Sequence, residues 1–404
     1  MQYDTINLVC DTLFMILNDR CSEDPKTENC QGRECIMKKY DIAAIIWPAY
    51  TGDEPRTRIF WPEGYGEWQT VKAVKPKYEG HMWPRKPLWG YVNEADPYIM
   101  EMQIEVATSY GVNVFIYDWY WYDNRPFLEQ CLNNGFLKAR NKDKMKFYLM
   151  WANHTATSMW DTRTANRWDP IWDGAVDRKT FEFIANRTIE KYFTEPNYYK
   201  IDGKPVYMLF DIENLVRGLG GVEETLDALK WFREQTVKAG FPGLELHYTV
   251  RGKGYMDKII DEKSGMDILT FVNMCEFDGV THYGYTDFVD TKKSYLDVVR
   301  DVAVGYAQVK ETVKAPYYPN VSMGWDPNPR YPHFIDEICY DTTPENIEKG
   351  FALAKKYIDE STDLKAPLIV VNSWNEWTEG TYLQPDDING YGYLEAIKKI
   401  FMDS

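Results

Sequence analysis

Short apolar runs that alternate with helical stretches constrain the fold of this chain more than any other feature. The runs begin at Asp41, Val112, Lys146, Pro205, Leu244, Asp267, Tyr317 and Pro367. Within each run the apolar residues are continuous, as in strands that are buried on both faces. Eight such strands separated by helices predict a closed parallel (β/α)8 barrel, because right-handed crossovers and ring closure leave few other arrangements.

A doubly wound open sheet is the alternative to the barrel. That fold normally carries a Gly-rich phosphate-binding loop after its first strand. Here the first run ends in WPAYTGDEP, and neither G-x-G-x-x-G nor a Walker sequence follows any run. The sequence therefore favours the barrel. Since no Pro-, Gly- or Ser-rich linker divides the chain, we assign residues 39–404 to one catalytic barrel domain and residues 1–38 to an N-terminal extension.

Helix-start signals lie between the apolar runs. Asp96, Asp177 and Thr343 are residue types that cap helices, and a proline suited to the first helical position follows Asp96 and Thr343. We also expect a helix over residues 221–240 and a single short helix over residues 255–263.

The charge balance excludes some partners. The chain has 46 Lys and Arg against 62 Asp and Glu, a formal net charge of −16, and no basic stripe. Nucleic-acid phosphates need clustered Lys and Arg, so we expect no nucleic-acid partner. No apolar run approaches the ~20 residues of a membrane-spanning helix. The first residues lack a basic segment and a cleavage site, so we expect a soluble protein, either periplasmic or cytoplasmic.

The cysteine and histidine patterns do not predict a metal site. Four cysteines precede the barrel without a paired C-x-x-C: Cys10, Cys21, Cys30 and Cys35. They are compatible with one or two disulfides in an oxidising compartment. The other three, Cys131, Cys275 and Cys339, are expected to be buried thiols. The five histidines form no H-x-x-H or H-x-x-x-H pair, and no EF-hand loop is present. We therefore expect neither a metal nor a cofactor.

The residues expected at the carboxyl ends of the strands are rich in aromatic rings and carboxylates. They are Trp47, Tyr50, Asp118, Trp119, Tyr120, Trp121, Trp151, Asn153, His154, Asp211, Glu213, Tyr248, Asn273, Glu276, Trp325, Asp326, Asn375, Glu376, Trp377 and Glu379. In a barrel this end forms the reaction pocket. Sugar rings stack on Trp and Tyr, while their hydroxyls bond to Asp, Asn and Glu. Each aromatic residue alone is equally compatible with rim packing, but the set predicts a carbohydrate site.

Glu376 and Glu379 are the sharpest candidate pair, within WNEWTEG at residues 374–380. Cleavage of a glycosidic bond needs one carboxylic acid to protonate the leaving oxygen and a second carboxylate at the anomeric side. Two neighbouring acids shielded by tryptophans are expected to raise one pKa and leave the other group ionised. A solvated acidic turn, or a pair of helix-capping acids, is the other interpretation of this spacing.

From about Tyr40 to the C-terminus, the motifs resemble the WbsX-type, glycoside hydrolase family 99-like group of bacterial polysaccharide loci. The motifs are GEW at 66–68 with KP at 75–76 and GH at 80–81, YDWYW at 117–121, WAN at 151–153, GWD at 324–326 ending in PR at 329–330, and NEWTEG at 375–380. Two positions depart from the pattern: many members have Glu where this chain has His154 and Gln384.

The resemblance implies a (β/α)8 barrel and retaining, endo-acting hydrolysis of α-mannosidic linkages. In this group the 2-hydroxyl of the substrate is thought to displace the leaving group and form a 1,2-anhydro sugar. Glu376 would then be the base that assists the 2-hydroxyl, and Glu379 the acid/base that protonates the departing oxygen. The resemblance adds to the expected sugar site the residues Glu67, Trp68, His81, Arg330 and Gln384.

Two other functions stay open besides hydrolysis of an α-linked oligosaccharide or polysaccharide. One is glycosyl transfer, which usually needs a diphosphate site, with a D-x-D metal motif or with Arg or Lys at a helix N-terminus. The chain has no D-x-D triplet. The other is a non-catalytic carbohydrate-binding barrel, which would leave the two glutamates without a reason to lie together.

Overall fold

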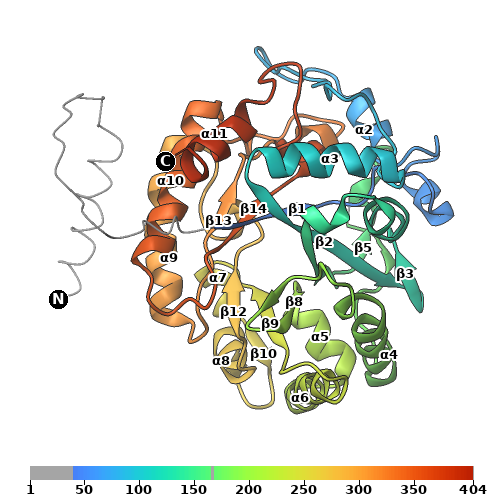
Figure 1. Ribbon diagram of the computed structural model, residues 1–404, viewed down its shortest axis with the longest axis vertical. Helices are drawn as coiled ribbons and strands as arrows, with labels where there is room; N and C mark the ends of the chain where they lie inside the picture. Colours follow the sequence, from blue (N-terminus) through green and yellow to red (C-terminus); the bar gives the residue numbers. More distant parts are fainter. Residues whose placement is uncertain (1–39, 165–167, 404) are drawn as a thin grey trace.

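The computed structural model describes residues 40–164 and 168–403. The N-terminal extension predicted over residues 1–38, with its four cysteines, lies outside the described residues. Figure 1 shows a central set of strands with helices around it. Cys131, Cys275 and Cys339 are buried free thiols, as expected.

Eight parallel strands form the barrel. They are β1 (Asp41–Ile46), β2 (Val112–Tyr122), β4 (Lys146–Trp151), β8 (Lys204–Leu209), β9 (Glu245–Thr249), β12 (Gly279–Thr281), β13 (Asn320–Ser322) and β14 (Leu368–Asn372). Their order is β12-β9-β8-β4-β2-β1-β14-β13. The ring closes through a single parallel bridge between Val280 and Tyr317, where Val280 N donates to Pro316 O at 2.9 Å and Tyr318 N donates to Val280 O at 2.8 Å. The predicted (β/α)8 barrel is thus confirmed.

Helices cover the outside of the ring. They are α2 (Trp68–Ala73), α3 (Pro97–Ser109), α4 (Arg178–Thr188), α5 (Ile212–Leu219), α6 (Val222–Lys238), α7 (Lys253–Met256), α8 (Ile268–Met274), α9 (Tyr295–Thr312), α10 (Pro344–Glu360) and α11 (Gly392–Phe401). Between β2 and β4 the crossover is made of the turns η2 (Cys131–Gly135), η3 (Phe136–Lys138) and η4 (Lys142–Lys144). Within the described ranges, no helix is long and apolar enough to span a membrane.

Short elements decorate the loops. The strands are β3 (Arg125–Phe127), β5 (Ala156–Thr157), β6 (Pro170–Trp172), β7 (Lys200–Ile201), β10 (Ile259–Asp261), β11 (Met266–Asp267), β15 (Asn375–Glu376) and β16 (Thr381–Tyr382). The remaining turns are η1 (Pro55–Ile59), η5 (Ser158–Trp160), η6 (Ile189–Phe193), η7 (Tyr285–Asp287), η8 (Asn328–Arg330) and η9 (Trp377–Glu379).

The three predicted helix starts are confirmed by their caps. The side chain of Asp96 accepts a hydrogen bond from Tyr98 N at the start of α3, and Asp177 accepts one from Thr180 N at the start of α4. Thr343 caps α10 by accepting from Asn346 N. Each side chain satisfies a backbone N–H that has no partner within its helix.

The sixth strand was predicted in the wrong place. Residues 267–273 were expected to be a strand, but 268–274 form helix α8, whose first turn is capped by Asp267 through Thr270 N. The sixth strand is β12, only three residues long, and so short a run gives no distinct apolar signal. The short helix expected over 255–263 is also wrong, since α7 ends at Met256 and β10 pairs with β11.

This correction moves two candidate residues away from the barrel mouth. Asn273 lies on α8, where its Nδ2 donates to Thr312 O and its Oδ1 accepts from Lys314 N. The carbonyl of Glu276 accepts from Arg233 Nη2 in the loop after α8. Neither residue directly follows a barrel strand, so neither lies at the strand ends that form the pocket.

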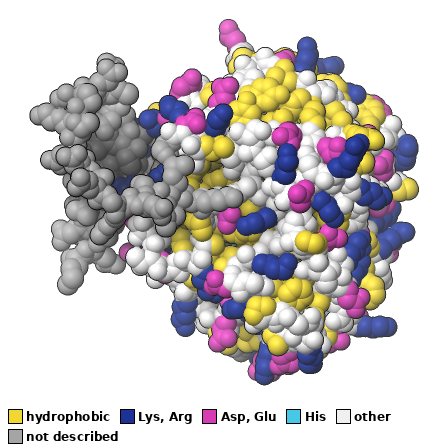
Figure 2. Space-filling view, in the orientation of Figure 1, with side chains coloured by type: hydrophobic (Ala, Val, Ile, Leu, Met, Phe, Trp, Pro, Cys, Tyr) yellow, Lys and Arg dark blue, Asp and Glu magenta, His cyan; other side chains and the backbone are white. Residues whose placement is uncertain are grey.

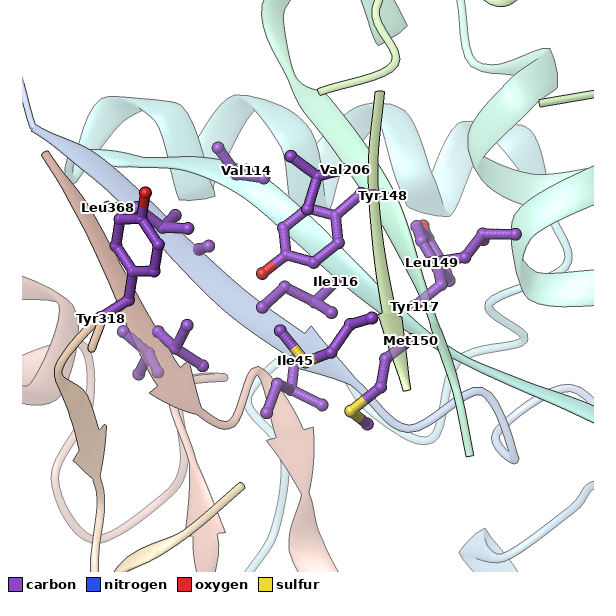
Figure 3. Close-up of a cluster of buried hydrophobic side chains, with 14 of the residues drawn as sticks. Ile45, Val114, Ile116, Tyr117, Tyr148, Leu149, Met150, Val206, Tyr318 and Leu368 are labelled. Atoms are coloured by element: carbon purple, nitrogen blue, oxygen red, sulfur yellow. The ribbon is translucent and has the colours of Figure 1, made fainter. Parts of the chain in front are cut away.

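The lower part of the barrel interior is filled with apolar side chains. Because side chains alternate along a strand, every second residue of each strand points inward. Figure 3 shows Ile116, Tyr148 and Val206 from three neighbouring strands pointing toward one another, while Tyr117 and Leu149 point away. All five are nearly inaccessible to solvent. The next inward positions along β2 are Asp118 and Tyr120. The inward side chains of this strand thus change from apolar in the core to polar at the mouth of the barrel.

Charges are mixed on the surface. On the face drawn in Figure 2, Lys and Arg side chains are interspersed with Asp and Glu. Most ion pairs have partly or largely exposed partners, for example Arg125 with Asp123 and Arg300 with Asp297. Such pairs contribute little to stability because water and salt screen them.

Closure of the barrel predicts a sensitive glycine on β12. A Cβ added at Gly279 would lie 2.5 Å from Tyr318 Cε2 and 2.8 Å from His247 Nε2. We expect Gly279→Ala to lower the free energy of unfolding by about 1–3 kcal/mol, because an overpacked interior must shift. Urea denaturation measures this change. The control is Gly254→Ala on α7, where a Cβ meets nothing within 4 Å. Equal stability of the two variants would contradict the closure described above.

Candidate active site

A pocket of about 360 Å³ opens at the carboxyl ends of the barrel strands. Its lining includes Trp47, Asp118, Tyr120, His154, Asp211, Trp325, Arg330, Glu376 and Glu379, all of them predicted site residues. It also includes Met150, Trp160, Phe210, Arg251, Tyr283 and Asp287. The volume lies within the range of small-molecule sites, and the wall combines aromatic faces with carboxyl groups.

The loop after β14 positions the two glutamates. Glu376 lies on β15, where its backbone N donates to Ser373 Oγ at 2.7 Å. Glu379 ends the η9 turn, and Gly380 follows in the left-handed region with φ +66°. A Cβ at Gly380 would also lie 3.0 Å from Asp326 Cβ, so glycine suits the turn and its close neighbour. The turn brings both carboxyl groups to one wall of the pocket.

Arg330 joins three glutamates. It lies in η8, only 4% exposed, and its Nη2 donates to Glu376 Oε2 at 3.0 Å. Its Nη1 donates to Glu379 Oε1, and its Nε donates to Glu67 Oε1 at 3.4 Å. Glu67 is fully buried and also accepts from Thr378 Oγ1 at 3.1 Å and from the indole N–H of Trp47. One guanidinium thus faces three carboxyl groups in a nearly dry site.

This charge imbalance raises the pKa values of the catalytic candidates. Burial and the neighbouring Glu379 raise the pKa of Glu376 well above its usual value, while Arg330 opposes the rise. Burial also raises the pKa of Glu379, again against the influence of Arg330. Since one cation does not compensate three anions, the cluster favours holding a proton.

The two glutamates differ in their hydrogen bonds. Both carboxyl oxygens of Glu376 have donors, because Tyr283 Oη lies 3.0 Å from Oε1 and Arg330 holds Oε2. Glu379 receives a donor on Oε1 from Arg330, and no hydrogen bond to its other oxygen occurs among residues 40–164 and 168–403. The pattern stabilises the anion of Glu376 and leaves an oxygen of Glu379 available for a proton.

Asp118 is a third buried carboxyl group on the pocket wall. Tyr283 Oη lies 3.2 Å from its Oδ2, and its Oδ1 has no partner in the described structure. Burial raises the pKa of Asp118 well above its usual value, and hydrogen bonding to Tyr283 opposes the rise. Asp118 therefore favours its neutral form.

A layer of polar contacts supports the glutamate loop from behind. Asn375 Nδ2 donates to Trp47 O and to Glu94 Oε2, both at 2.9 Å. Glu94, fully buried, also accepts from Gln384 Nε2 at 2.8 Å and from Gln103 Nε2 at 3.1 Å. Burial raises the pKa of Glu94 to about 7, although these amide donors oppose the rise. Asn375 and Gln384 thus hold the loop rather than line the pocket.

A second pocket, of about 370 Å³, adjoins the first. Its walls include Tyr78, His81, Trp83, Arg85, Asp326 and Tyr340, and Trp325 lines both pockets. His81 Nδ1 accepts from Lys77 N, so its Nε2 carries the hydrogen that Asp326 Oδ2 accepts at 3.1 Å. Burial alone would raise the pKa of Asp326, but hydrogen bonds from His81 and Asn328 lower it. Of the predicted sugar-site residues, His81 and Asp326 belong to this second pocket.

The other predicted residues are buried outside the lining of both pockets: Tyr50, Glu67, Trp68, Trp119, Trp151, Asn153, Asn375, Trp377 and Gln384. For Trp119 and Trp151 the reason is strand alternation, which turns them toward the helices. The indole N–H of Trp119 donates to Glu129, and Trp151 packs on Phe181 of α4. Asn153 instead bonds the backbone of Asp211 through both of its amide atoms.

Three ionisable pocket residues were not predicted from the sequence: Arg251, Tyr283 and Asp287. Arg251 follows β9, and Tyr283 and Asp287 follow β12. Tyr283 and Asp287 were missed because the sixth strand was placed too early. The run GVTH at 279–282 before two aromatic residues was the available signal, but only four residues carry it. Arg251 follows a strand that was predicted correctly, and its charge alone gave no reason to select it.

Within the described ranges, no group of three or more His, Cys, Asp or Glu side chains is arranged to hold a metal ion. The pocket offers carboxyl groups, phenols, guanidinium groups and aromatic walls.

Comparisons with known sequences identify a family. The model described as Glycosyltransferase WbsX matches residues 43–397. The uncharacterized protein WxcX of Xanthomonas campestris pv. campestris is 25% identical over 352 residues, in strain ATCC 33913 and in strain B100. The alignment covers 85% of this chain and 47% of WxcX. The chain thus spans about half the length of the curated relatives it matches.

Solved structures share the fold. The GH99 endo-α-mannosidase from Bacteroides thetaiotaomicron superposes with a TM-score of 0.57 at 14% identity, over 90% of this chain and 97% of the enzyme. A glycoside hydrolase-like protein gives the same TM-score and identity over 94% of this chain and 97% of its own. At these identities the likeness shows the barrel fold alone.

Removal of Arg330 should expose the charge imbalance. We expect Arg330→Met to lower the free energy of unfolding by about 3–5 kcal/mol, because it leaves buried carboxylates without their cation. In the variant the native carboxyl groups hold protons that the unfolded chain releases above about pH 4.5. The stability deficit should therefore grow as the pH rises above that value.

Urea denaturation at about pH 5 and about pH 8 measures this deficit. The matched control is Arg125→Met, whose pair with Asp123 is largely exposed and should contribute less than about 1 kcal/mol. A deficit that shrinks toward alkaline pH would contradict the ionic role assigned to Arg330.

Proposed function

The chain belongs to the WbsX family, and from the pocket that its barrel carries we propose that it is a glycoside hydrolase acting on an α-linked glycan. The observation that carries the proposal is the convergence of Glu376 and Glu379 on Arg330 at one wall of an aromatic pocket. An acid and a base on the same wall, with different hydrogen bonding, are what glycosidic cleavage requires.

The hydrogen bonds suggest a role for each glutamate. Glu376 has donors on both oxygens, which favour its anion against the rise in pKa that burial causes, and we assign it as the base that takes the proton of the substrate's 2-hydroxyl. The oxygen so activated attacks the anomeric carbon, and the glycosidic bond breaks as Glu379 gives its proton to the leaving oxygen. Water then opens the resulting 1,2-anhydro sugar: Glu379 takes a proton from the water, and Glu376 returns its proton to the 2-oxygen. Two inversions at the anomeric carbon give net retention.

The walls suggest where the sugars lie. Trp47, Tyr120, Trp160 and Trp325 line the first pocket, and flat rings of this kind stack on sugar C–H faces. The second pocket continues past Trp325 with further aromatic walls. We therefore place glycan residues on both sides of the scissile bond, which corresponds to endo action.

An α-mannoside is the substrate we propose first, because the GH99 barrel from Bacteroides thetaiotaomicron is an endo-α-mannosidase. Of the two departures from the family pattern, only His154 reaches the first pocket, where its Nδ1 lies 3.1 Å from Thr155 O. Gln384 is held by Glu94 and Trp377 behind the loop. We thus expect any difference in sugar preference to arise at His154 rather than at Gln384.

Replacement of either glutamate should abolish turnover. We expect Glu376→Gln and Glu379→Gln each to lower kcat by at least about 100-fold, since general acid or base catalysis is lost. Glycan affinity should persist, because an amide keeps the shape of the carboxyl group. The assay is product release from a panel of microbial and plant glycans with linkage read by mass spectrometry, and calorimetry gives the affinity.

Glu360→Gln is the matched control, since its side chain on α10 is 68% exposed and lines neither pocket. Full activity in either catalytic variant would refute the assigned roles. Glycan binding with no turnover by the unaltered protein would instead indicate a non-catalytic carbohydrate-binding barrel.

Glycosyl transfer, the activity in the family's description, is opposed by the charge of the pocket. Five carboxyl residues line it, namely Asp118, Asp211, Asp287, Glu376 and Glu379, against the two cations Arg251 and Arg330. A sugar nucleotide would bring a diphosphate into this surplus of carboxyl groups.

We expect calorimetry to give dissociation constants above about 1 mM for a panel of nucleotide sugars. Micromolar binding of any of them would favour transfer over hydrolysis.

A further inference from the structure

Tyr283 bridges two carboxyl groups with a single phenolic hydroxyl. Its Oη lies 3.2 Å from Asp118 Oδ2 and 3.0 Å from Glu376 Oε1. A phenol has one hydrogen to donate, and an ionised carboxylate only accepts. Ionisation of Tyr283 itself is excluded, because burial and the nearby Asp118 raise its pKa well above the usual value. If both contacts are hydrogen bonds, one of the two carboxyl groups must be protonated.

The surroundings decide which group holds that proton. Glu376 has a cation, since Arg330 Nη2 donates to its Oε2 at 3.0 Å. Asp118 forms no ion pair in the described structure, is 4% exposed, and its Oδ1 has no hydrogen-bond partner. A buried charge that has no counter-ion, and one oxygen without any partner, is costly, whereas a neutral acid in the same place costs much less. The proton therefore belongs on Asp118.

We propose that Asp118 is a positioning residue that is neutral in the resting protein and donates its hydrogen to Tyr283, so that the Tyr283 hydroxyl points at Glu376. The chain of hydrogen bonds then runs in one direction, from Asp118 through Tyr283 to the Glu376 anion. Asp118 thereby keeps Glu376 ionised and ready to accept a proton. This catalytic consequence rests on the proposed function, but the position of the proton does not.

The groups that face Asp118 affect its pKa in opposite directions. Tyr120 lies on the same strand as Asp118, and Glu379 faces it from η9. Burial raises the pKa of Asp118 and the nearby Glu379 adds to the rise, whereas hydrogen bonding to Tyr283 and Tyr120 opposes it. Arg330 instead donates to Glu376 and Glu379. The cation thus stabilises the Glu376 anion rather than a charge on Asp118.

Asp118→Asn tests the proposal, because its amide is a permanent neutral donor that reproduces a protonated aspartic acid. We expect Asp118→Ala to lower kcat/KM at least about 10-fold, and Asp118→Asn to lose clearly less than Asp118→Ala. The acidic limb of the kcat/KM profile should stay in place in Asp118→Asn. In Tyr283→Phe it should move to higher pH, because Glu376 loses a donor that stabilises its anion.

An ionised Asp118 would give the opposite result. Its replacement by Asn would remove a negative charge beside Glu376 and move the acidic limb to lower pH, which would overturn the proposal. A loss in Asp118→Asn as large as in Asp118→Ala would also overturn it. Circular dichroism shows whether each variant is folded. If Asp118→Ala is unfolded, the pH profile of Asp118→Asn tests the proposal by itself.

Infrared spectroscopy tests the position of the proton without any turnover. The difference spectrum between the unaltered protein and Asp118→Asn, at about pH 7, should contain the carbonyl band of a protonated carboxylic acid. A carboxylate band in its place would refute the proposal even if no substrate is found. Conversely, a carboxylic acid band in a protein that cleaves no glycan would sustain the proton assignment and remove the proposed function alone.

Discussion

The guanidinium of Arg330 is the constraint on which the candidate site depends. It is a cation that contacts two buried glutamates, Glu67 and Glu376, and the partly exposed Glu379, so it fixes all three around one point. Its position in η8 ties the loop after β13 to the loop after β14, and through Glu67 to the start of α2. The same deficit of positive charge that makes this cluster costly to bury also makes it suitable for chemistry, because it keeps a proton among carboxyl groups at neutral pH.

Much of the fold could be predicted because its signals are local. Buried strands such as β1 and β14 are continuous apolar runs, and Asp96 and Thr343 stand where helix caps belong. β12 could not be found this way. Three residues carry little pattern, and the apolar segment predicted in place of β12, residues 267–273, lies almost entirely in helix α8, which Asp267 caps. Pairing with β9 and the bridge to Tyr317 define this strand, and both are contacts distant in sequence.

In the candidate site too, local signals were readable from the sequence and contacts distant in sequence were not. Glu376 and Glu379 could be singled out because their spacing and their place after a strong strand are local properties. The orientation of Trp119 and Trp151 could not, since a run of aromatic residues does not reveal which of them face the barrel interior. Tyr283 was missed together with its strand. Arg330 was expected from a motif, yet its part in the site, one cation shared by three acids, becomes visible only when distant loops are placed together.

The side chain of Trp325 is a wall common to both pockets. Because one side chain lines both pockets, the two halves of a bound ligand are not recognised independently. A substitution of Trp325 that enlarges one pocket also reshapes the other, so selectivity for the two ends of a ligand changes together. Under the proposed function, selectivity for new glycans is therefore expected to diverge through the outer rims, where each pocket has residues of its own, before the shared indole changes.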